Sequence, residues 1–465
     1  MPTPEPVVFV ARTNREELRR LLQLALPTAL AQLLGMLMGF VDTVMLGHYS
    51  TDAMAAAVTA NSIVFGTLMF ANGVLFGLDP LIAQAHGAGQ GWRAGLAAQR
   101  GAVLSLVLSV PIGVAWLFMG DLFVLLGQEP RLAPLAHTYA LALIPGIPAF
   151  LLASVARSFL QGREIVRPAM YATAIANLVN ALANWVLIYG NLGFPELGIL
   201  GAGIATTTTR IFTLLLLVAW IRGFDLHAGA WEPWTRRALD PAGLRAIVAI
   251  GVPIAIQVGT EMWAFNLAML LAGTMGATSA AAHGVAIGMA SLSFMLALGV
   301  AVAATTRVGN LLGAGRSQEA QRSARVAMSM GAGVMTVSAV AFVALRDVLP
   351  LLYTRDAEVV ALAAAILPIA AAFQVFDGTQ AVGCGVLRGM GRTTPAAVIN
   401  GIGYWLLALP IAWVLGVKRD SLEGIWWGMA LGLAVVAVSL VAWIRVRGPA
   451  SLAPGSLTVL EGERA

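Results

Sequence analysis

The chain has 465 residues, of which 59% are hydrophobic and 11% are charged, and its mean hydropathy is +0.83. A soluble domain carries about a quarter of charged residues, so this composition indicates a membrane protein and excludes an ordinary soluble enzyme. The formal net charge of +5 is interpreted as a signal of topology and not of nucleic-acid binding. With a single cysteine, Cys384, no intrachain disulfide is possible.

Twelve apolar stretches are long enough to cross the hydrocarbon core, which takes about 20 residues of helix. We therefore predict an all-α integral membrane protein with twelve transmembrane helices. The predicted spans are 18–46, 53–78, 93–119, 133–154, 166–190, 199–221, 242–272, 279–306, 318–345, 357–386, 393–416 and 424–444.

The basic residues predict the orientation. If the N-terminus is cytoplasmic, most of the 28 lysine and arginine residues lie on the inner side of the membrane, as the positive-inside rule requires. Both termini are then expected in the cytoplasm, with the protein in the plasma membrane, which is the inner membrane of a bacterium. The same basic excess would attract anionic membrane lipids.

The chain contains two copies of one six-span unit. Pro27 lies opposite Pro253, and the motif 84–89 lies opposite 310–315, both at an offset of 226 residues. An even number of spans in each copy predicts parallel repeats, an arrangement known among transporters. The predicted organisation is an N-terminal segment 1–17, an N-lobe 18–221, a connector 222–241, a C-lobe 242–445 and a tail 446–465.

Three carboxylates interrupt the apolar spans: Asp42, Glu261 and Asp377. A charge at membrane depth costs at least a few kcal/mol, so such residues usually face a partner or a watery cavity. Glu261 and Asp377 both lie in the second repeat, opposite Gly35 and Phe150 of the first. Because repeat symmetry did not impose these charges, they indicate a site for a cation or a cationic substrate.

In the first repeat, Asn180 and Asn184 share one face of the fifth span, and Thr206 supplies a hydroxyl in the sixth. A carboxylate, amide oxygens and a hydroxyl are the ligands that a hard cation needs when it sheds water. We therefore predict a coupling-ion site for Na⁺ at Asp42, Asn180, Asn184 and Thr206. The alternative for the asparagines is simple hydrogen bonding between helices.

In the second repeat, each carboxylate has glutamine neighbours on its own helix, and aromatic and methionine residues are frequent nearby. Aromatic faces attract organic cations, and methionine adapts to varied shapes. Glu261 and Asp377 are accordingly predicted to bind both the coupling ion and the substrate. The further residues predicted to bind substrate are Gln257, Gln374, Phe265, Met269 and Phe376.

Arg210, in the sixth span, is expected to neutralise a carboxylate. The sequence has no nucleotide-binding GxxxxGK[ST] motif, no HExxH and no cluster of Cys and His. We therefore predict that the protein is not an enzyme, has no catalytic residues and no cofactor, and uses an ion gradient. The coupling ion is Na⁺ or H⁺, because a buried carboxylate can bind either.

The segments FVDTVMLGHYS, LIAQAHGAG, TRVGNLLGAG and GVLRGMGRTTPA, together with the duplication, resemble the MATE (multidrug and toxic compound extrusion) family in its NorM-like branch. The resemblance covers nearly the whole chain. It implies a V-shaped bundle of two six-helix lobes that exports organic cations or drugs in exchange for Na⁺ or H⁺, with the ion sites named above. Asp79 departs from the pattern, in which a neutral residue is expected.

Two alternatives remain open beside a multidrug exporter. A lipid-linked oligosaccharide flippase of the same superfamily would favour extra spans and a cationic cavity. A passive channel would need a filter or a repeated constriction. A monomer is expected, because one chain carries both lobes. The sequence names neither the cargo nor the lobe that binds it.

Overall fold

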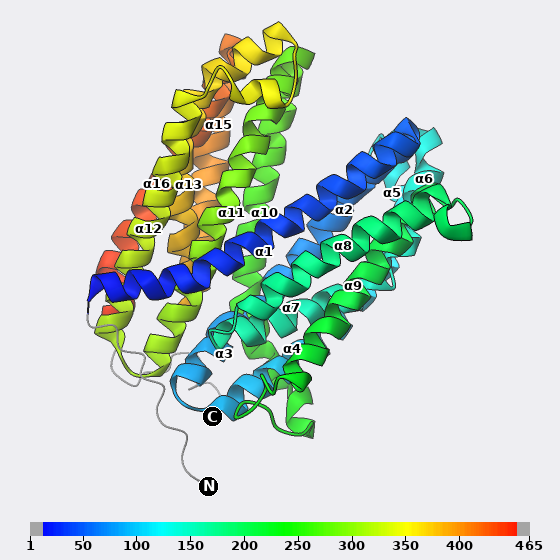
Figure 1. Cartoon of the computed structure of the whole chain (residues 1–465). Helices are drawn as coiled ribbons and strands as arrows, with labels where there is room; N and C mark the ends of the chain where they lie inside the picture. Colours follow the sequence, from blue (N-terminus) through cyan, green and yellow to red (C-terminus); the bar gives the residue numbers. More distant parts are fainter. Residues whose placement is uncertain (1–12, 453–465) are drawn as a thin grey trace. The chain divides into compact units, whose positions relative to one another are not determined.

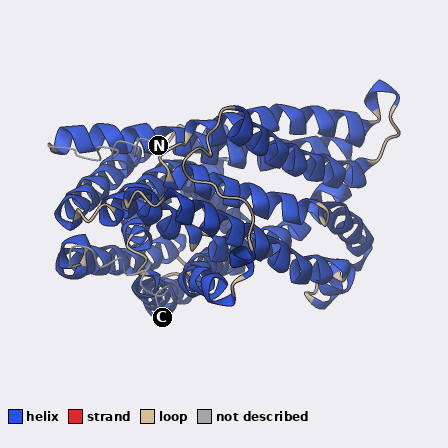
Figure 2. Ribbon diagram, turned by 90° about the horizontal axis from the view of Figure 1, so that it is seen from below, coloured by secondary structure: helices blue, strands red, loops and turns tan. Residues whose placement is uncertain are grey.

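The computed structural model describes residues 13–452, and every regular element in this range is a helix, which confirms the all-α class (Figure 2). The predicted segments 1–17 and 446–465 lie partly outside the described residues. The α-helices are α1 (Asn14–Tyr49), α2 (Thr51–Leu75), α3 (Leu78–Gly87), α4 (Gly91–Leu117), α5 (Met119–Leu125), α6 (Ala133–Leu143), α7 (Gly146–Gly162), α8 (Arg167–Tyr189), α9 (Gly198–Gly223), α10 (Pro241–Thr274), α11 (Ala277–Gly313), α12 (Ser317–Ala344), α13 (Ala357–Gly389), α14 (Thr393–Gly401), α15 (Leu409–Leu415) and α16 (Leu422–Arg447).

Shorter helical turns join several of these helices. A π-helical turn, η5 (Ile402–Ala408), lies between α14 and α15. The 3-10 turns are η1 (Pro130–Leu132), η2 (Asn191–Gly193), η3 (Arg236–Leu239), η4 (Leu349–Leu352), η6 (Val417–Arg419) and η7 (Pro449–Ser451).

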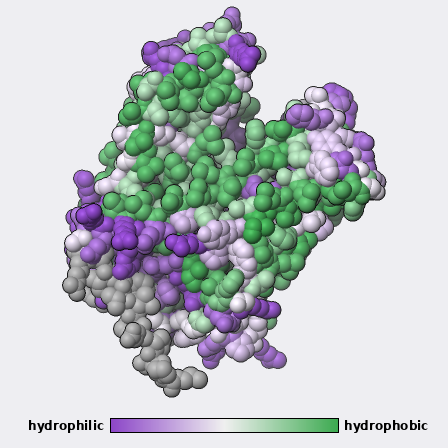
Figure 3. Space-filling view, viewed as in Figure 1, coloured by the Kyte–Doolittle hydropathy of each residue, from purple (hydrophilic) through white to green (hydrophobic). Residues whose placement is uncertain are grey.

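The helices agree with the predicted membrane spans. In the described chain, 11 helices are long and apolar enough to cross a membrane. The number of spans is 12 if one bent pair of helices counts as a single span. The flanks of the helices carry hydrophobic side chains, and hydrophilic residues gather at the helix ends (Figure 3). Large exposed side chains such as Phe40, Leu178 and Val438 are typical of surfaces that face lipid.

The fourth predicted span, 133–154, has to be corrected. The span consists of two helices, Pro130–Leu143 and Gly146–Gly162, which are bent by 50°. Pro145 occupies the N-cap of the second helix, where a residue without an amide hydrogen is tolerated. The second helix continues beyond the predicted end at residue 154 to Gly162, because its polar residues have partners within the protein. Ser158, for example, donates a hydrogen bond to Asp79 at 2.7 Å.

The same contact accounts for Asp79, the residue that departs from the family pattern. The second span runs from Thr51 to Gly87, and Asp79 lies in the first turn of α3, the second of the two helices in this span. A carboxylate at a helix N-terminus interacts favourably with the helix dipole. Asp79 is therefore a structural residue that stabilises the start of α3 and binds α7.

The contacts between Cα atoms divide the described residues into two compact units. Unit 1 contains residues 13–30, 83–89 and 252–452, and unit 2 contains 31–82 and 90–251. Helices α11–α16 of unit 1 are yellow-green to red in Figure 1, and α2 and α4–α9 of unit 2 are blue to green. The predicted lobes, 18–221 and 242–445, correspond to the two sequence repeats. The compact units differ from them, because each unit also contains short segments of the other repeat.

The exchanged segments pack through glycine. In unit 1, a Cβ atom at Gly299 of α11 would lie 2.7 Å from the carbonyl oxygen of Ala25 in α1. In unit 2, a Cβ at Gly251 of α10 would lie 1.9 Å from the carbonyl oxygen of Val74 in α2. At the repeat offset of 226, residue 25 corresponds to 251 and residue 299 to 73. The first helix of each repeat thus packs on the second span of the other repeat at matching positions, with small residues that allow the backbones to approach closely.

A reciprocal contact joins the two copies of the repeated motif within unit 1. A Cβ at Gly87 would lie 1.9 Å from the carbonyl oxygen of Asn310, and a Cβ at Gly313 would lie 2.0 Å from that of Gln84. These are equivalent positions in the two repeats, so each motif contacts the other in the same way. This is the pattern of an interface related by a two-fold axis.

A buried ion pair holds the start of α1 in unit 1. Arg307 of α11 donates to both carboxylate oxygens of Glu17, at 2.9 and 3.0 Å, and the side chains are 0% and 3% exposed. In unit 2, Arg100 of α4 interacts with Asp240, just before α10, at 3.4 Å, and donates to the carbonyl of Arg237. An arginine therefore fixes the beginning of the first helix of each repeat.

The glycine contact can be tested by adding one methyl group. Gly87→Ala should destabilise the protein by about 1–3 kcal/mol or more, because the neighbouring atoms belong to the backbone and cannot rotate away. Gly35→Ala is the control, since a Cβ there meets no atom within 4 Å. Thermal unfolding in detergent measures both variants, and equal midpoints would contradict the assigned packing.

The buried pair predicts a non-additive response to mutation. Glu17→Ala should cost about 3–5 kcal/mol, because Arg307 is left as an uncompensated buried charge. The double variant Glu17→Leu with Arg307→Met should recover most of this loss, since no charge then remains. Thermal unfolding of the two single variants and the double variant checks this, and additive losses would show that the two residues do not act as a pair.

Candidate functional site

The four residues predicted as a coupling-ion site meet in unit 2. Asp42 comes from α1, Asn180 and Asn184 from α8, and Thr206 from α9. Asn184 donates from Nδ2 to Asp42 Oδ1 at 2.5 Å and to Asn180 Oδ1 at 3.2 Å, while Thr206 donates to Asp42 Oδ2 at 3.4 Å. The spacing of four residues between the asparagines puts both on one face of α8. Both asparagines are buried, and Asp42 is half-buried.

Other polar residues of these helices have separate partners. Asn177 donates to the carbonyl of Thr173 one turn earlier. Thr207 and Thr209 donate to the carbonyls of Ala142 and Ala205. Of the run of threonines in α9, Thr206 is thus the one that hydrogen-bonds Asp42.

The cluster matches a small hard cation in the type of its ligands. It contains one carboxylate, two amide groups and one hydroxyl, all of which supply oxygen. Two buried amide atoms, Asn184 Oδ1 and Asn180 Nδ2, have no hydrogen-bond partner among the described residues. Rotation of the Asn184 amide would turn its oxygen toward Asp42. A cation or a proton would neutralise a carboxylate whose two direct partners, Asn184 and Thr206, are both uncharged.

Arg210 does not form the ion pair that we expected from the sequence. It is close enough to Asp42 for an electrostatic interaction, but it makes no ion pair within 4 Å with any described residue, and its Nη1 atom is buried without a partner. Its guanidinium lies over the ring of Phe150, 5.4 Å from the ring centre. Both oxygens of Asp42 already accept hydrogen bonds from uncharged groups, so the charge of Arg210 acts on this carboxylate without a direct ion pair.

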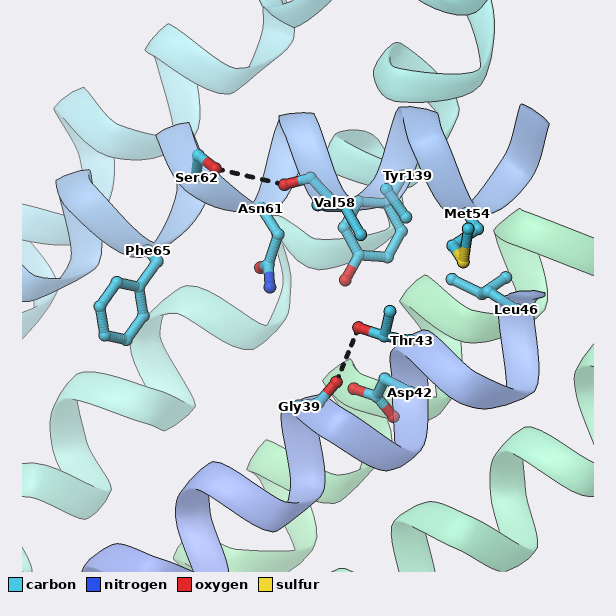
Figure 4. Close-up of a pocket in the computed structure, with 11 residues that line it drawn as sticks. Gly39, Asp42, Thr43, Leu46, Met54, Val58, Asn61, Ser62, Phe65 and Tyr139 are labelled. Carbon is cyan, nitrogen blue, oxygen red and sulfur yellow. Dashed lines mark hydrogen bonds between the residues drawn. The ribbon is translucent and has the colours of Figure 1, made fainter. Parts of the chain in front are cut away.

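A pocket of about 250 Å³ opens beside Asp42, between α1 and α2 (Figure 4). Tyr139 of α6 and the α2 residues Asn61, Ser62 and Phe65 line it together with Asp42. We did not single out Asn61, Ser62 or Tyr139 from the sequence. The signal available for Asn61 and Ser62 was that they are adjacent polar residues in a mostly apolar span.

The second acidic site lies in unit 1 and is organised by Gln380 of α13. Its Nε2 atom donates to Glu261 Oε2 of α10 at 3.3 Å and to Asn400 Oδ1 of α14 at 2.7 Å. Gln257, one turn before Glu261 on the same helix, is close enough to interact with this carboxylate. Asn400, which the sequence analysis did not identify, donates in turn to the carbonyl of Ala396.

Asp377 lies in the same interior and is only 4% exposed. It is close enough to Glu261 for the two charges to repel each other, and its Oδ1 atom has no partner among the described residues. Gln374, one turn earlier, accepts a hydrogen bond from Ser293 of α11 at 2.8 Å, while its Nε2 atom has no partner. The two carboxylates repel each other when both are ionised, so a proton or cation that binds to either one would stabilise the pair.

Aromatic side chains pack beside this acidic pair. Phe265 contacts Phe373 and Tyr404 with ring centres 5.9 and 5.8 Å apart. Tyr404 lies in the π-helical turn η5, and Pro410, which follows it, cannot donate the hydrogen bond that an α-helix needs. Such turns occur frequently at functional sites.

The remaining two predicted substrate residues lie at the edge of this region. Phe376 is half-buried, and Met269 is 41% exposed. Neither makes a ring contact or hydrogen bond with another described side chain. Their role in binding substrate stays a prediction.

Comparison with known proteins identifies the family. The MatE family model matches residues 27–186 and again 253–414. The two matches begin 226 residues apart, which is the repeat offset observed in the sequence.

Solved structures of similar fold cover nearly the whole chain. A eukaryotic MATE transporter, AtDTX14, has a TM-score of 0.87 at 22% identity, with 97% of this chain and 99% of that chain covered. An outward-facing multidrug resistance MATE family transporter of the MOP superfamily has a TM-score of 0.84 at 20% identity, with both chains fully covered. A MOP superfamily transporter from Pyrococcus furiosus, described as having a binding pocket of reverse polarity, scores 0.83 at 21% identity over 97% and 99% of the two chains. The chain belongs to the MATE (MatE) family of membrane transporters.

Proposed function

We propose that the protein is a secondary active exporter that exchanges Na⁺ or H⁺ for organic cations, including drugs. The observation that carries this proposal is the Asp42 cluster, in which a carboxylate among membrane-spanning helices binds only uncharged groups directly. A cation that binds there is stabilised by the charge of Asp42, and its release leaves the carboxylate with its uncharged hydrogen-bond partners and the more distant charge of Arg210. The same residue can therefore bind an ion on one side of the membrane and release it on the other.

The acidic pair of unit 1 supports a role in both ion and cargo binding. Glu261 and Asp377 repel each other and are bordered by aromatic rings, so an organic cation would gain from charge and from ring faces together. A coupling ion that neutralises one carboxylate would weaken the attraction for such a cargo. The proposal includes Gln257, Gln374, Phe265, Met269 and Phe376 as neighbours of the cargo.

The cellular setting is part of the same proposal. The protein lies in the plasma membrane, the inner membrane in a bacterium, and the distribution of arginine favours an orientation with both termini in the cytoplasm. We further propose a monomer of the NorM-like branch that contacts membrane lipids, binds no nucleic acid and requires no cofactor other than the coupling ion.

An oligosaccharide flippase is the second candidate. A cargo with a pyrophosphate would need cationic groups in the cavity, and Arg157 and Arg210 are two guanidinium groups in unit 2 that have no ion pair within 4 Å among the described residues. The carboxylates in both units favour cation exchange more strongly. Counterflow in proteoliposomes with an imposed Na⁺ or pH gradient separates exchange from flipping and from passive conduction.

The variant Asp42→Asn tests the Asp42 cluster. Its uptake of a fluorescent organic cation into inverted proteoliposomes, driven by a Na⁺ or pH gradient, should fall to the level of protein-free liposomes, because a neutral amide cannot exchange charge. The control is Asp121→Asn, which removes an exposed carboxylate from the same unit. Wild-type transport by Asp42→Asn at both low and high Na⁺ would exclude Asp42 as the coupling residue.

The acidic pair of unit 1 is tested by equilibrium binding. If ion and cargo compete for its charge, each lowers the affinity of the other by the same factor. Glu261→Gln and Asp377→Asn should each reduce this antagonism by about 1–3 kcal/mol, while Glu358→Gln, an exposed change in the same helix as Asp377, should not. Cargo affinity measured across Na⁺ concentration and pH decides, and full antagonism in both variants would assign the exchange to the Asp42 cluster alone.

A further inference from the structure

The connector, residues 222–241, links α9 to α10 and packs on other helices of unit 2. A Cβ at Gly95 of α4 would lie 2.1 Å from the carbonyl oxygen of Ala230, so only glycine lets the two backbones come this close. One turn further along α4, Gln99 donates from Nε2 to the carbonyl of Glu232 at 2.8 Å. The backbone of the connector therefore lies directly on α4 at this point.

Two arginines also hold the connector in place. Arg163, the residue that follows α7, donates hydrogen bonds to the carbonyls of Leu226 and Ala228. Arg100 of α4 holds the other end of the connector through its ion pair with Asp240. Both of these guanidinium groups thus have partners inside the protein. The connector is fixed at its beginning, its middle and its end, and what it exposes has a defined position.

The fixed connector exposes aromatic and apolar side chains. Trp234 is 57% and Leu239 is 60% exposed, and Trp231 and Phe224 are exposed as well. The two tryptophan rings contact each other with centres 6.2 Å apart, and Trp231 also contacts Phe159 of α7. Exposed apolar patches of this kind mark interaction sites, and tryptophan is enriched where a membrane meets water.

The same segment carries arginines that have no partner inside the protein. Arg236 and Arg237 lie in the turn η3 and are exposed. In the part of the chain that the structure describes, neither side chain makes an ion pair within 4 Å or a hydrogen bond. Arg222 is a third exposed arginine, and the exposed carboxylates of Asp225 and Glu232 offset part of the charge. The densest positive charge of the connector is therefore the adjacent pair Arg236 and Arg237, beside the exposed tryptophans in sequence.

An anionic phospholipid matches both parts of this surface. Its phosphate accepts charge-assisted hydrogen bonds from guanidinium groups, and the base of its acyl chains suits tryptophan rings at the membrane boundary. The connector continues from α9, whose exposed Ile211 and Leu215 are typical of a surface that faces lipid. In the predicted orientation the connector lies on the cytoplasmic side, where the leaflet carries anionic lipids. A soluble anion would use the arginines but leave the aromatic side chains in water.

We infer that the connector is a binding site for one anionic phospholipid, whose phosphate is held by Arg236 and Arg237 while its apolar part lies against Trp231 and Trp234. The basic excess of the whole chain predicts only a general attraction to negative membranes. The contacts that fix the connector add a defined site to that attraction. The site requires neither a coupling ion nor a cargo, so it goes beyond the proposed function.

Native mass spectrometry of the purified protein, titrated with phosphatidylglycerol or phosphatidylcholine in detergent, tests the arginines. The wild-type protein should bind phosphatidylglycerol more tightly, since phosphatidylcholine has no net charge. Arg236→Gln combined with Arg237→Gln should weaken phosphatidylglycerol binding by about tenfold or more, because each arginine near a membrane surface contributes about fivefold. Equal affinity of the wild-type protein for both lipids would overturn the inference without any variant.

A matched control removes the same charge elsewhere. Arg325→Gln combined with Arg447→Gln takes two exposed arginines from α12 and α16, which are predicted to lie on the same side of the membrane. This variant should bind phosphatidylglycerol as the wild-type protein does. If both double variants lose affinity equally, net charge and not the connector attracts the lipid, and the inference is wrong.

Brominated lipids test the tryptophans, because bromine quenches the fluorescence of an indole that it contacts. In nanodiscs, brominated phosphatidylglycerol should quench the wild-type protein more than brominated phosphatidylcholine does. Replacing Trp231 and Trp234 together by leucine should remove this difference. An unchanged difference would show that the two rings do not contact the anionic lipid, which contradicts the proposed site.

Two other occupants give different results. A tenfold molar excess of inorganic phosphate over phosphatidylglycerol should leave the difference in quenching unchanged, and its loss would assign the arginines to free phosphate instead. A dimer in the native mass spectra that disappears in the tryptophan variant would assign the surface to a second copy of the chain. None of these measurements uses an ion gradient. Failure of the lipid site therefore leaves the proposed exchange standing, and a protein that binds lipid without exchange would reject only the latter.

Discussion

The cost of placing a charge among apolar helices governs this structure. Where the protein needs a fixed contact, it supplies the opposite charge, as Arg307 does for Glu17. Where it supplies only uncharged hydrogen-bond partners, as at Asp42, or leaves an oxygen without a partner, as in Asp377, the proposed coupling ion or cargo would supply balancing charge. The completeness of the electrostatic pairing therefore distinguishes the structural charges from those assigned to transport.

The two sequence repeats form two compact units that carry different charged sites. Each compact unit takes its main helices from one repeat and a short segment from the other, and glycines such as Gly87 and Gly251 allow the exchanged backbones to come close. Asp42 and Glu261 lie farther along α1 and α10, the same helices that make such contacts. Because the two repeats differ in their polar residues, similar backbones can hold an Asp42 cluster in one unit and a Glu261 and Asp377 pair in the other.

Much of the fold and part of the site follow from the sequence. Span lengths depend on bilayer thickness, and the Asp42 cluster follows from the helical spacing of Asn180 and Asn184, because both are local patterns. The bend near Pro145 and the continuation of α7 to Gly162 were missed, since hydropathy alone ends a span at its polar residues. The lack of an ion pair at Arg210 depends on how helices that are far apart in sequence pack. The periodic pattern of residues within one helix carries no information on that packing.

The Glu17–Arg307 pair also constrains how the chain acquires its structure during synthesis. The two residues are separated by 290 positions, so the beginning of α1 leaves the ribosome long before α11 exists. Domains that are continuous in sequence complete their contacts one after another during translation. Unit 1 cannot complete its contacts in this way, because its first segment packs against helices that are synthesised from the second half of the chain. Until then Glu17 has no arginine to bury against, which favours keeping the first turn of α1 at the hydrated membrane surface while most of the polypeptide is inserted.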